Sequence, residues 1–339
     1  MKTEIVKSNW PIVGNNHIFE FLAKSLANNN VAGSYIFAGP ANLGKTAAAR
    51  FFAQSLVCES KDLSVLPCGQ CPACIQASKG IHSDIYFIKK EPEKKNISLE
   101  QVRDFIRNLS LSSFLNSYKI GIIKGAENLS QGAVNALLKT LEEPKIKVVI
   151  ILTAANLETL PKTILSRSQI FRFRAVAASV IYDELIKNHQ ASRSQAKNFS
   201  RLSAGRPALA LKFLEDKEYY ESYKAYVKSF AGLLDSDING RFKAIANVLG
   251  KDARGQEAVK RAAGLINVWQ NLARDLMLME LNLTDLIQHQ AFIKELEPLK
   301  NKLNLKALLN LINVLKQGRE YLAVNVNPKL ALENAAVSF

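Results

Sequence analysis

The chain has 339 residues, 48% of them hydrophobic, and carries 45 Lys and Arg against 30 Asp and Glu, a formal net charge of +15 at pH 7. This length favours two or three domains with ordinary hydrophobic cores. The longest strongly apolar run, Val148–Leu152, is far too short to cross a bilayer, and the start Met1–Glu4 lacks the apolar segment of a signal peptide. We therefore expect a soluble, cytoplasmic protein with no membrane partner.

The excess of basic residues lies on the first two-thirds of the chain. Residues 1–210 carry 27 Lys and Arg against 15 Asp and Glu, whereas residues 211–339 carry 18 against 15. The sequence pI near 9.6 indicates an acidic partner such as nucleic acid. A merely soluble basic protein is the alternative, because net charge does not fix a partner.

Residues 10–30 contain the first helical pattern. It places Ile18, Phe19, Leu22 and Leu26 on one face, and three asparagines end it. The segment leads into the first strand and can flank a nucleotide base.

Strand, loop and helix follow in the order that a phosphate-binding loop needs. Tyr35–Ala38 is an apolar run typical of a buried parallel strand, and Ala47–Leu56 predicts a helix. The loop between them fits the pattern G-x-x-x-x-G-K-[ST] and consists of Gly39, Pro40, Ala41, Asn42, Leu43, Gly44, Lys45 and Thr46. Backbone N–H groups at the helix start would face phosphate, Lys45 would reach the terminal phosphates, and Thr46 would hold Mg²⁺. Asn42 stands where glycine is usual, and asparagine tolerates left-handed backbone better than most residues.

All cysteines of the chain lie within seventeen positions of one another. They are Cys58, Cys68, Cys71 and Cys74, with proline and glycine turns among them. Four thiolates at this spacing predict a closed, tetrahedral, structural Zn²⁺ site, with unligated or oxidised cysteines as the alternative. His82 and Asp84 follow closely, and we expect them to be packing or capping groups because four thiolates already saturate zinc.

Further apolar runs predict four more strands. They are Ile85–Ile88, Tyr118–Ile123, Val148–Thr153 and Ile170–Phe173. Helices are expected between them: Ser98 and Gln101 resemble a capping box that opens one helix, and Gly132–Glu143 forms another. Five strands alternating with helices make a doubly wound, parallel α/β sheet.

The end of the third strand carries no acidic residue. In phosphate-loop NTPases the acid that holds Mg²⁺ sits at the end of such a strand. Here Lys124 and Gly125 occupy the end, and Glu127 is the nearest carboxylate. After residue 175 the apolar period is helical throughout, and Asn327 with Pro328 fits the start of the last helix.

These residues together resemble the delta-prime subunits of the bacterial DNA polymerase III clamp loader, a family within the AAA+ ATPase superfamily. The resemblance covers roughly residues 10–175. It rests on the phosphate loop, the four cysteines, and the stretches 82–84, 135–144 and 166–168. Beyond these residues it is loose and rests on the stretch 325–330 and the helical pattern.

The resemblance implies three domains: an AAA+ core at 1–175 with a zinc module at 58–74, a helical lid at 176–215, and a helical collar at 216–339. It also implies a ring of five with gamma/tau and delta subunits, which opens the sliding clamp and places it on primed DNA as part of the replicative polymerase holoenzyme. The family's Ser-Arg-Cys motif corresponds to Ser166-Arg167-Ser168, so Arg167 would act as an arginine finger toward a neighbour's ATP.

Two departures from active AAA+ motors indicate a subunit that does not hydrolyse ATP. Lys124 and Gly125 replace the acidic pair, and an ammonium at that place would repel Mg²⁺; the lid arginine would align at Ala208, with Arg206 two residues early. Binding of ATP or ADP stays open, and Lys124 either neutralises phosphate without metal or is a solvated lysine. The alternatives are an active gamma/tau-like motor on DNA and a zinc-stabilised DNA-binding module without a ring.

Overall fold

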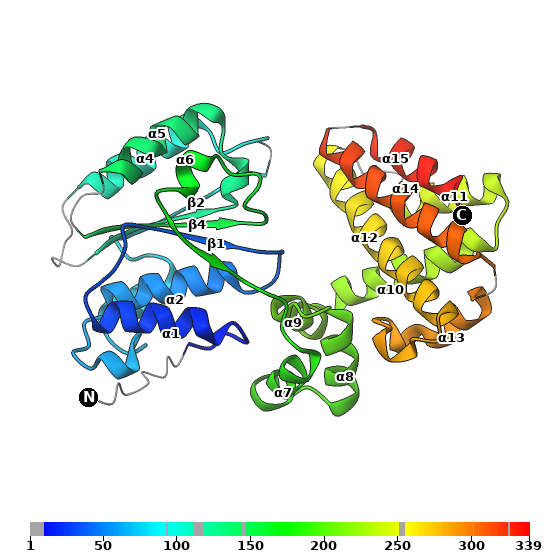
Figure 1. Ribbon diagram of the computed structural model, residues 1–339, viewed down its shortest axis with the longest axis horizontal. Coiled ribbons are helices and arrows are strands. Elements are labelled where there is room, and N and C mark those ends of the chain that lie inside the picture. The colour runs from blue at the N-terminus through cyan, green and yellow to red at the C-terminus, as the bar shows by residue number, and fades with distance from the viewer. Residues whose placement is uncertain are drawn as a thin grey trace. The chain divides into compact units, whose positions relative to one another are not determined.

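The computed structural model describes residues 10–92, 94–111, 118–143, 147–250, 255–300, 302–324 and 326–339 (Figure 1). The chain divides into two compact units. The first contains residues 1–181 and 205–208, and the second contains residues 182–204 and 209–339. The division into core, lid and collar stays a prediction. Among the described residues, no helix combines the length and the apolarity needed to cross a membrane.

The first unit alternates strands and helices, as predicted. Its strands are β1 (Ser34–Ala38), β2 (Ile85–Lys89), β3 (Lys119–Lys124), β4 (Val148–Ala154) and β5 (Gln169–Arg172). Its helices are α1 (Asn16–Ala27), α2 (Lys45–Val57), α3 (Pro72–Lys79), α4 (Leu99–Ser110), α5 (Gln131–Glu142) and α6 (Lys162–Leu165). Pro144, which directly follows the helix predicted at 132–143, lies outside the described residues.

The five strands form one parallel sheet in the order β2-β3-β4-β1-β5. This confirms the expected α/β fold. Every residue of β1 and of β4 is buried, because helices cover both faces of such a sheet and its strands are continuous apolar runs. Strand β5 lies at one edge, next to β1, which places residue 167 just before an edge strand.

Two hydrophobic clusters occupy the two faces of the sheet. Tyr35 and Phe37 point to one face and pack with residues of α1 and α2, including Phe52. Ile36 points to the other face and packs with residues of α4 and α5, including Phe105. Figure 1 shows α1 and α2 below the sheet and α4, α5 and α6 above it, so the sheet is doubly wound.

Local signals explain where several helices begin. Ser98 Oγ accepts the N–H of Gln101 while the Gln101 side chain accepts the N–H of Ser98, so the predicted capping box is present. The helix after the phosphate loop begins at Lys45, two residues earlier than predicted. Gly44 has φ 86°, and this left-handed turn brings the chain directly into the helix.

The second unit is helical in its described part. Its helices are α7 (Ala178–His189), α8 (Arg193–Leu202), α9 (Pro207–Glu215), α10 (Lys217–Leu234), α11 (Ile238–Leu249), α12 (Gly255–Glu280), α13 (Ile293–Leu296), α14 (Leu305–Ala323) and α15 (Pro328–Ala336), of which α7 and α9 begin in the first unit. Asn327 caps α15 by accepting the N–H of Lys329 at 2.9 Å, as predicted; Asn325 lies outside the described residues. Trp269 of α12 is fully buried, donates to Ser229 Oγ at 3.1 Å, and packs against Phe339.

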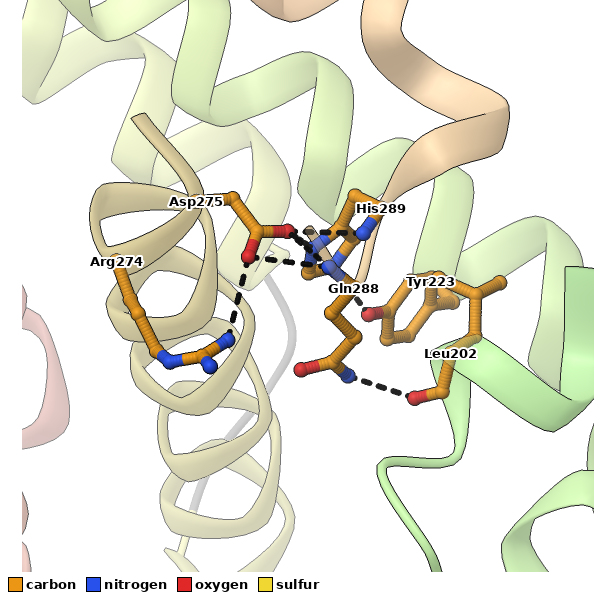
Figure 2. A network of polar contacts seen from close by, with 6 residues as sticks. All are labelled: Leu202, Tyr223, Arg274, Asp275, Gln288 and His289. Atoms are coloured by element: carbon orange, nitrogen blue, oxygen red, sulfur yellow. Dashed lines mark hydrogen bonds and ion pairs between the residues drawn. The ribbon is translucent and has the colours of Figure 1, made fainter. Parts of the chain in front are cut away.

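A buried polar network joins α8, α10 and α12 to the segment 284–292 (Figure 2). Asp275 of α12 accepts the backbone N–H groups of Gln288 and His289, and its Oδ2 lies 2.7 Å from His289 Nδ1. His289 Nε2 lies 2.6 Å from the hydroxyl of Tyr223 on α10, and the Gln288 side chain donates to the carbonyl of Leu202 on α8 at 2.7 Å. Nothing in the sequence pattern predicted this network.

Candidate nucleotide and metal sites

The phosphate loop leaves the carboxyl end of β1 with a conformation that requires glycine. Gly39 has φ 142°, and a Cβ there would lie 2.5 Å from the carbonyl oxygen of Phe173. The Gly39 N–H donates to the carbonyl of Ala154 at 3.1 Å, which fixes the loop beside β4. Asn42 has φ 66°, so asparagine does adopt the left-handed backbone that the sequence suggested.

Lys45 lies folded against its own loop. Its Nζ donates to the carbonyls of Gly39 at 2.5 Å and Pro40 at 2.6 Å. Burial lowers the pKa of Lys45; the nearby carboxylate of Glu127 raises that pKa and the ammonium of Lys124 lowers it. The two charges therefore lie near Lys45, on the same edge of the sheet as the phosphate loop.

The end of β3 has no carboxylate, as the sequence indicated. Lys124 is exposed and pairs in register with Thr153 of β4. Gly125 donates its N–H to the carbonyl of Thr153 at 3.0 Å and to its hydroxyl at 3.1 Å. Glu127 Oε2 accepts the N–H of Ala155 at 3.3 Å. An ammonium thus occupies the strand end that supplies a Mg²⁺-holding acid in phosphate-loop NTPases, and the donor set does not fit that metal.

The first turn of α9 contacts the phosphate loop. The N–H of Ala208 donates to the carbonyl of Asn42 at 3.1 Å, and the N–H of Val176 donates to the carbonyl of Gly205 at 2.8 Å. Ala208 is where the family resemblance would align a lid arginine, so a methyl side chain takes that place next to the loop. The aligned position thus offers no cation toward a phosphate.

A hollow of about 410 Å³ lies beside Gly39 and Pro40 of the loop. It is lined by residues at the carboxyl ends of β1, β4 and β5, among them Pro40, Asn156, Glu158, Arg172 and Arg174. The sequence pattern gave no signal for it, because the residues come from three separate loops. The two arginines are exposed and add to the positive charge of this edge.

The cysteine sulfurs gather into one cluster. The four Sγ atoms all lie within 4.8 Å of one another, and those of Cys68 and Cys74 are 3.9 Å apart. All four cysteines are free of disulfide bonds. The N–H groups of Cys68, Cys71 and Cys74 donate to the sulfurs of Cys58, Cys68 and Cys71, each at 3.4 Å. Four convergent sulfurs, three of which accept these N–H bonds, suit a thiophilic metal ion.

The thiols of this cluster have different proton affinities. Hydrogen bonds from the backbone of Cys71 and Gln70 lower the pKa of Cys68 to about 6. Burial raises the pKa of Cys58 and of Cys74. A bound cation would favour the thiolate form of all four, since metal ligation requires deprotonated sulfur.

Arg167 lies between α6 and the edge strand β5. Its guanidinium forms an ion pair with Glu142 of α5 at 2.9 Å and donates to the carbonyl of Thr163 at 3.0 Å. The Arg167 side chain is 35% exposed and that of Glu142 is 48% exposed. The sequence had singled out Arg167 but gave no signal that Glu142 is its partner in the isolated chain.

Asp84 has a buried partner that the sequence pattern missed. Its carboxylate lies 3.1 Å from Lys119 Nζ, and both side chains are almost completely buried. His82 is also buried, and its Nδ1 accepts the N–H of Asp84 at 3.0 Å. His82 and Asp84 are thus packed in the interior, as expected, but Asp84 forms an ion pair with Lys119 that was not expected.

Parts of the chain are similar to known proteins. Residues 14–177 match the family described as "DNA polymerase III, delta subunit". Over these residues, slightly less than half of its length, the chain is similar to that family. The DNA polymerase III subunit tau of Bacillus subtilis is 34% identical over 189 residues, which are 56% of this chain and 33% of that protein. The delta' subunit of Pseudomonas aeruginosa is 35% identical over 136 residues, which are 40% of this chain and 41% of that one.

A solved structure supports the fold beyond the matched domain. A gamma subunit-related protein of Thermotoga maritima has a TM-score of 0.51 and 17% identity, and the match covers 93% of this chain and 97% of that one. The sequence matches are thus to DNA polymerase III subunits, and the match to the solved structure shows the fold alone. This chain spans only about a third of the length of the Bacillus tau subunit, and relatives of both tau and delta' type are present, so the matches do not separate these two roles.

Proposed function

We propose that the chain is a delta-prime-type subunit of the DNA polymerase III clamp loader that does not hydrolyse ATP. In this role it joins gamma/tau and delta subunits in a ring of five and helps to load the sliding clamp onto primed DNA. The delta-subunit-like domain and the relatives named as DNA polymerase III subunits support a place in this assembly. The basic excess of residues 1–210 suits an assembly that meets DNA.

The strand end at Lys124 and Gly125 is the observation that carries the non-hydrolysing role. Phosphoryl transfer in phosphate-loop NTPases needs Mg²⁺ to bridge the β- and γ-phosphates. Here an exposed ammonium and a glycine with φ 75° stand where that metal's carboxylate ligand would be. Glu127, the nearest carboxylate, accepts a backbone N–H of Ala155.

ATP turnover by the purified chain tests this role. We expect no turnover above background, and we expect Lys45→Ala to leave that background unchanged. Measurable hydrolysis that Lys45→Ala abolishes would show an active motor. In that case the gamma/tau-like alternative, which the tau relative favours, would replace the delta-prime role.

For Arg167 we propose a role toward a neighbour's ATP. A guanidinium is always charged and donates in a planar fork, which suits the charge that spreads over a γ-phosphate in the transition state. Its pair with Glu142 is half-exposed, and such pairs are worth about 0–1 kcal/mol. The guanidinium can therefore leave Glu142 at small cost when a phosphate is near.

For the cysteine cluster we propose one structural Zn²⁺ ion. Cys58, Cys68, Cys71 and Cys74 would hold it, with Zn–S distances of about 2.3 Å. The ion would fill all four coordination positions, so it would support the fold at 58–74 and take no part in catalysis. For the rest of the chain we propose an AAA+ core at 1–175, a lid at 176–215 and a collar at 216–339.

A further inference from the structure

We propose that the phosphate loop of this chain binds the phosphates of a nucleotide without a divalent cation, with the Lys124 ammonium in the place of Mg²⁺. The ligand class is a nucleoside di- or triphosphate in its metal-free form. The inference rests on the proposed function only in that a subunit that hydrolysed ATP would require the metal. It gives Lys124 a role in binding phosphate, in addition to explaining why the chain would not hydrolyse ATP.

The sheet brings Lys124 to the phosphate loop. Strand β4 lies between β3 and β1, and Thr153 is in register with Lys124 on one side and with Phe37 on the other. The loop begins two residues after Phe37, at Gly39, which donates to Ala154. Lys124 and the loop therefore leave the same edge of three adjacent strands at nearly the same level.

The charges at this edge suit a metal-free phosphate chain. Mg²⁺ normally offsets the negative charge that the loop amides and one lysine leave uncompensated. Here Lys45 uses two of the three N–H donors of its ammonium on the carbonyls of Gly39 and Pro40, which leaves one donor for an anion. The exposed ammonium of Lys124 brings three further donors and a full charge to the same edge.

Glu127 is the alternative to consider, because a carboxylate near the phosphate loop could hold Mg²⁺. Its carboxylate is near enough to raise the pKa of Lys45, and Glu127 is the acidic residue that follows the end of β3 most closely in the sequence. Against that role stands its bond to the N–H of Ala155 at 3.3 Å. A single carboxylate beside two ammonium groups also lacks the ligand set of a Mg²⁺ site.

Calorimetric titration of the full chain with ADP provides the test. Each titration is run once with EDTA and once with MgCl₂, on the wild-type chain and on Lys124→Ala, Lys124→Asp and Glu127→Gln. Lys24→Ala is the control, because Lys24 is an exposed lysine on α1 and its loss changes net charge equally. Circular dichroism melting verifies that each variant is folded.

We expect the wild-type chain to bind ADP in EDTA at least as tightly as in MgCl₂. Lys124→Ala should weaken binding in EDTA by about ten- to a hundredfold, the range for a hydrogen bond to a charged group, and Lys24→Ala should not. Lys124→Asp should bind more tightly with MgCl₂ than with EDTA. Glu127→Gln should bind at least as well as the wild type, because a carboxylate repels phosphate.

Three results would overturn the proposal. They are no ADP binding by the wild-type chain, equal binding by Lys124→Ala and wild type, or tighter binding in MgCl₂ that Glu127→Gln abolishes. The third would assign the metal to Glu127. None of these results bears on assembly with partner subunits, so failure here and failure of the proposed function are distinguishable.

Discussion

His82 shows how a single buried side chain couples stability to pH. Its ring lies beside the ion pair of Asp84 and Lys119, and its Nδ1 accepts the N–H of Asp84. Burial lowers the pKa of His82, while the carboxylate of Asp84 opposes that shift and Lys119 adds to it. The folded protein therefore holds this imidazole neutral, with its proton on Nε2.

This arrangement predicts a loss of stability in mild acid. A histidine in the unfolded chain takes up a proton below about pH 6.5, whereas His82 in the folded chain resists it. The unfolded state then binds more protons, so the contribution is complete above about pH 6.5 and falls as the pH drops toward the folded-state pKa. We expect the urea concentration at the midpoint of unfolding to decrease as the pH is lowered from 7.5 to 5.5.

The matched variant for this prediction is His82→Asn, whose side-chain oxygen can accept the N–H of Asp84. It should flatten the pH dependence of the urea midpoint in this range. If the urea midpoint depends on pH with the same slope in the wild type and in His82→Asn, then groups other than His82 cause the acid sensitivity.

At the scale of elements, the network around Asp275 fixes an irregular segment to the helices. Residues 284–292 contain two short 3₁₀ helices, Thr284–Leu286 and Gln290–Phe292, which bury little surface of their own. The carboxylate of Asp275 satisfies two backbone N–H groups and the imidazole of His289 (Figure 2). Gln288 and Tyr223 extend the same contacts to α8 and α10.

Asp275→Ala should therefore lower the free energy of unfolding by about 3–5 kcal/mol, because it leaves buried polar partners uncompensated. Asp275→Asn keeps an acceptor oxygen and should lose less. Asp285→Ala is the control, since Asp285 is an exposed acid of the same region. Urea denaturation measures all three, and equal effects of Asp275→Ala and Asp285→Ala would contradict the structural role of the network.

The cysteine module at 58–74 is a second element whose contribution to stability can be measured. Helix α2 holds it through Gln54, whose side chain donates to the carbonyl of Cys74 at 3.0 Å. Because structural zinc contributes folding free energy, Cys71→Ser should lower metal content and melting temperature together. The purified chain should contain about one Zn²⁺ by elemental analysis. A well-folded chain without metal, or with these sulfurs in disulfide bonds, would refute the zinc site.

The sequence predicted the elements whose signals are local. The five strands were predicted because each is a short apolar run between helices, and the capping box at Ser98 is a four-residue pattern. The contacts of Lys119 and Glu142 were not predicted, because their partners Asp84 and Arg167 are distant in sequence and no periodicity links them. The Asp275 network was missed for the same reason, since Tyr223 is 66 residues from His289.

For the whole molecule, the same limit applies to the helical half of the chain. The apolar period predicted helices after residue 175, and the structure has them from α7 onward. Their grouping was harder to foresee, because residues 182–204 and 209–339 share one unit while 205–208 belong with the sheet. Long-range bonds such as that of Ala208 with Asn42 decide this grouping, and a period of 3.6 residues carries no information about them.

In the proposed ring, this chain supplies an arginine finger and its partner subunits hydrolyse ATP, which leads to a prediction for the assembled clamp loader. If this chain contributes a finger and no hydrolysis, then its own phosphate loop and Arg167 should differ sharply in importance. In a clamp loader reconstituted with gamma/tau and delta subunits, Lys45→Ala in this chain should leave DNA- and clamp-stimulated ATP turnover nearly unchanged. Arg167→Ala should allow normal assembly but lower that turnover and slow clamp loading.

The loss on Arg167→Ala should be smaller than the effect of about 10³–10⁵-fold known for single-site fingers, because only one of several ATP sites would meet this guanidinium. Arg167→Lys should not restore turnover fully, since an ammonium lacks the planar fork.

Glu142→Gln distinguishes an arginine finger from a merely structural ion pair. It removes the same ion pair, 2.9 Å long, but leaves the guanidinium free to reach a neighbour. Turnover should therefore survive Glu142→Gln and fall with Arg167→Ala. Equal losses in the two variants would mean that the ion pair matters only to the fold of this chain, and unchanged turnover in both would remove Arg167 from the neighbour's site.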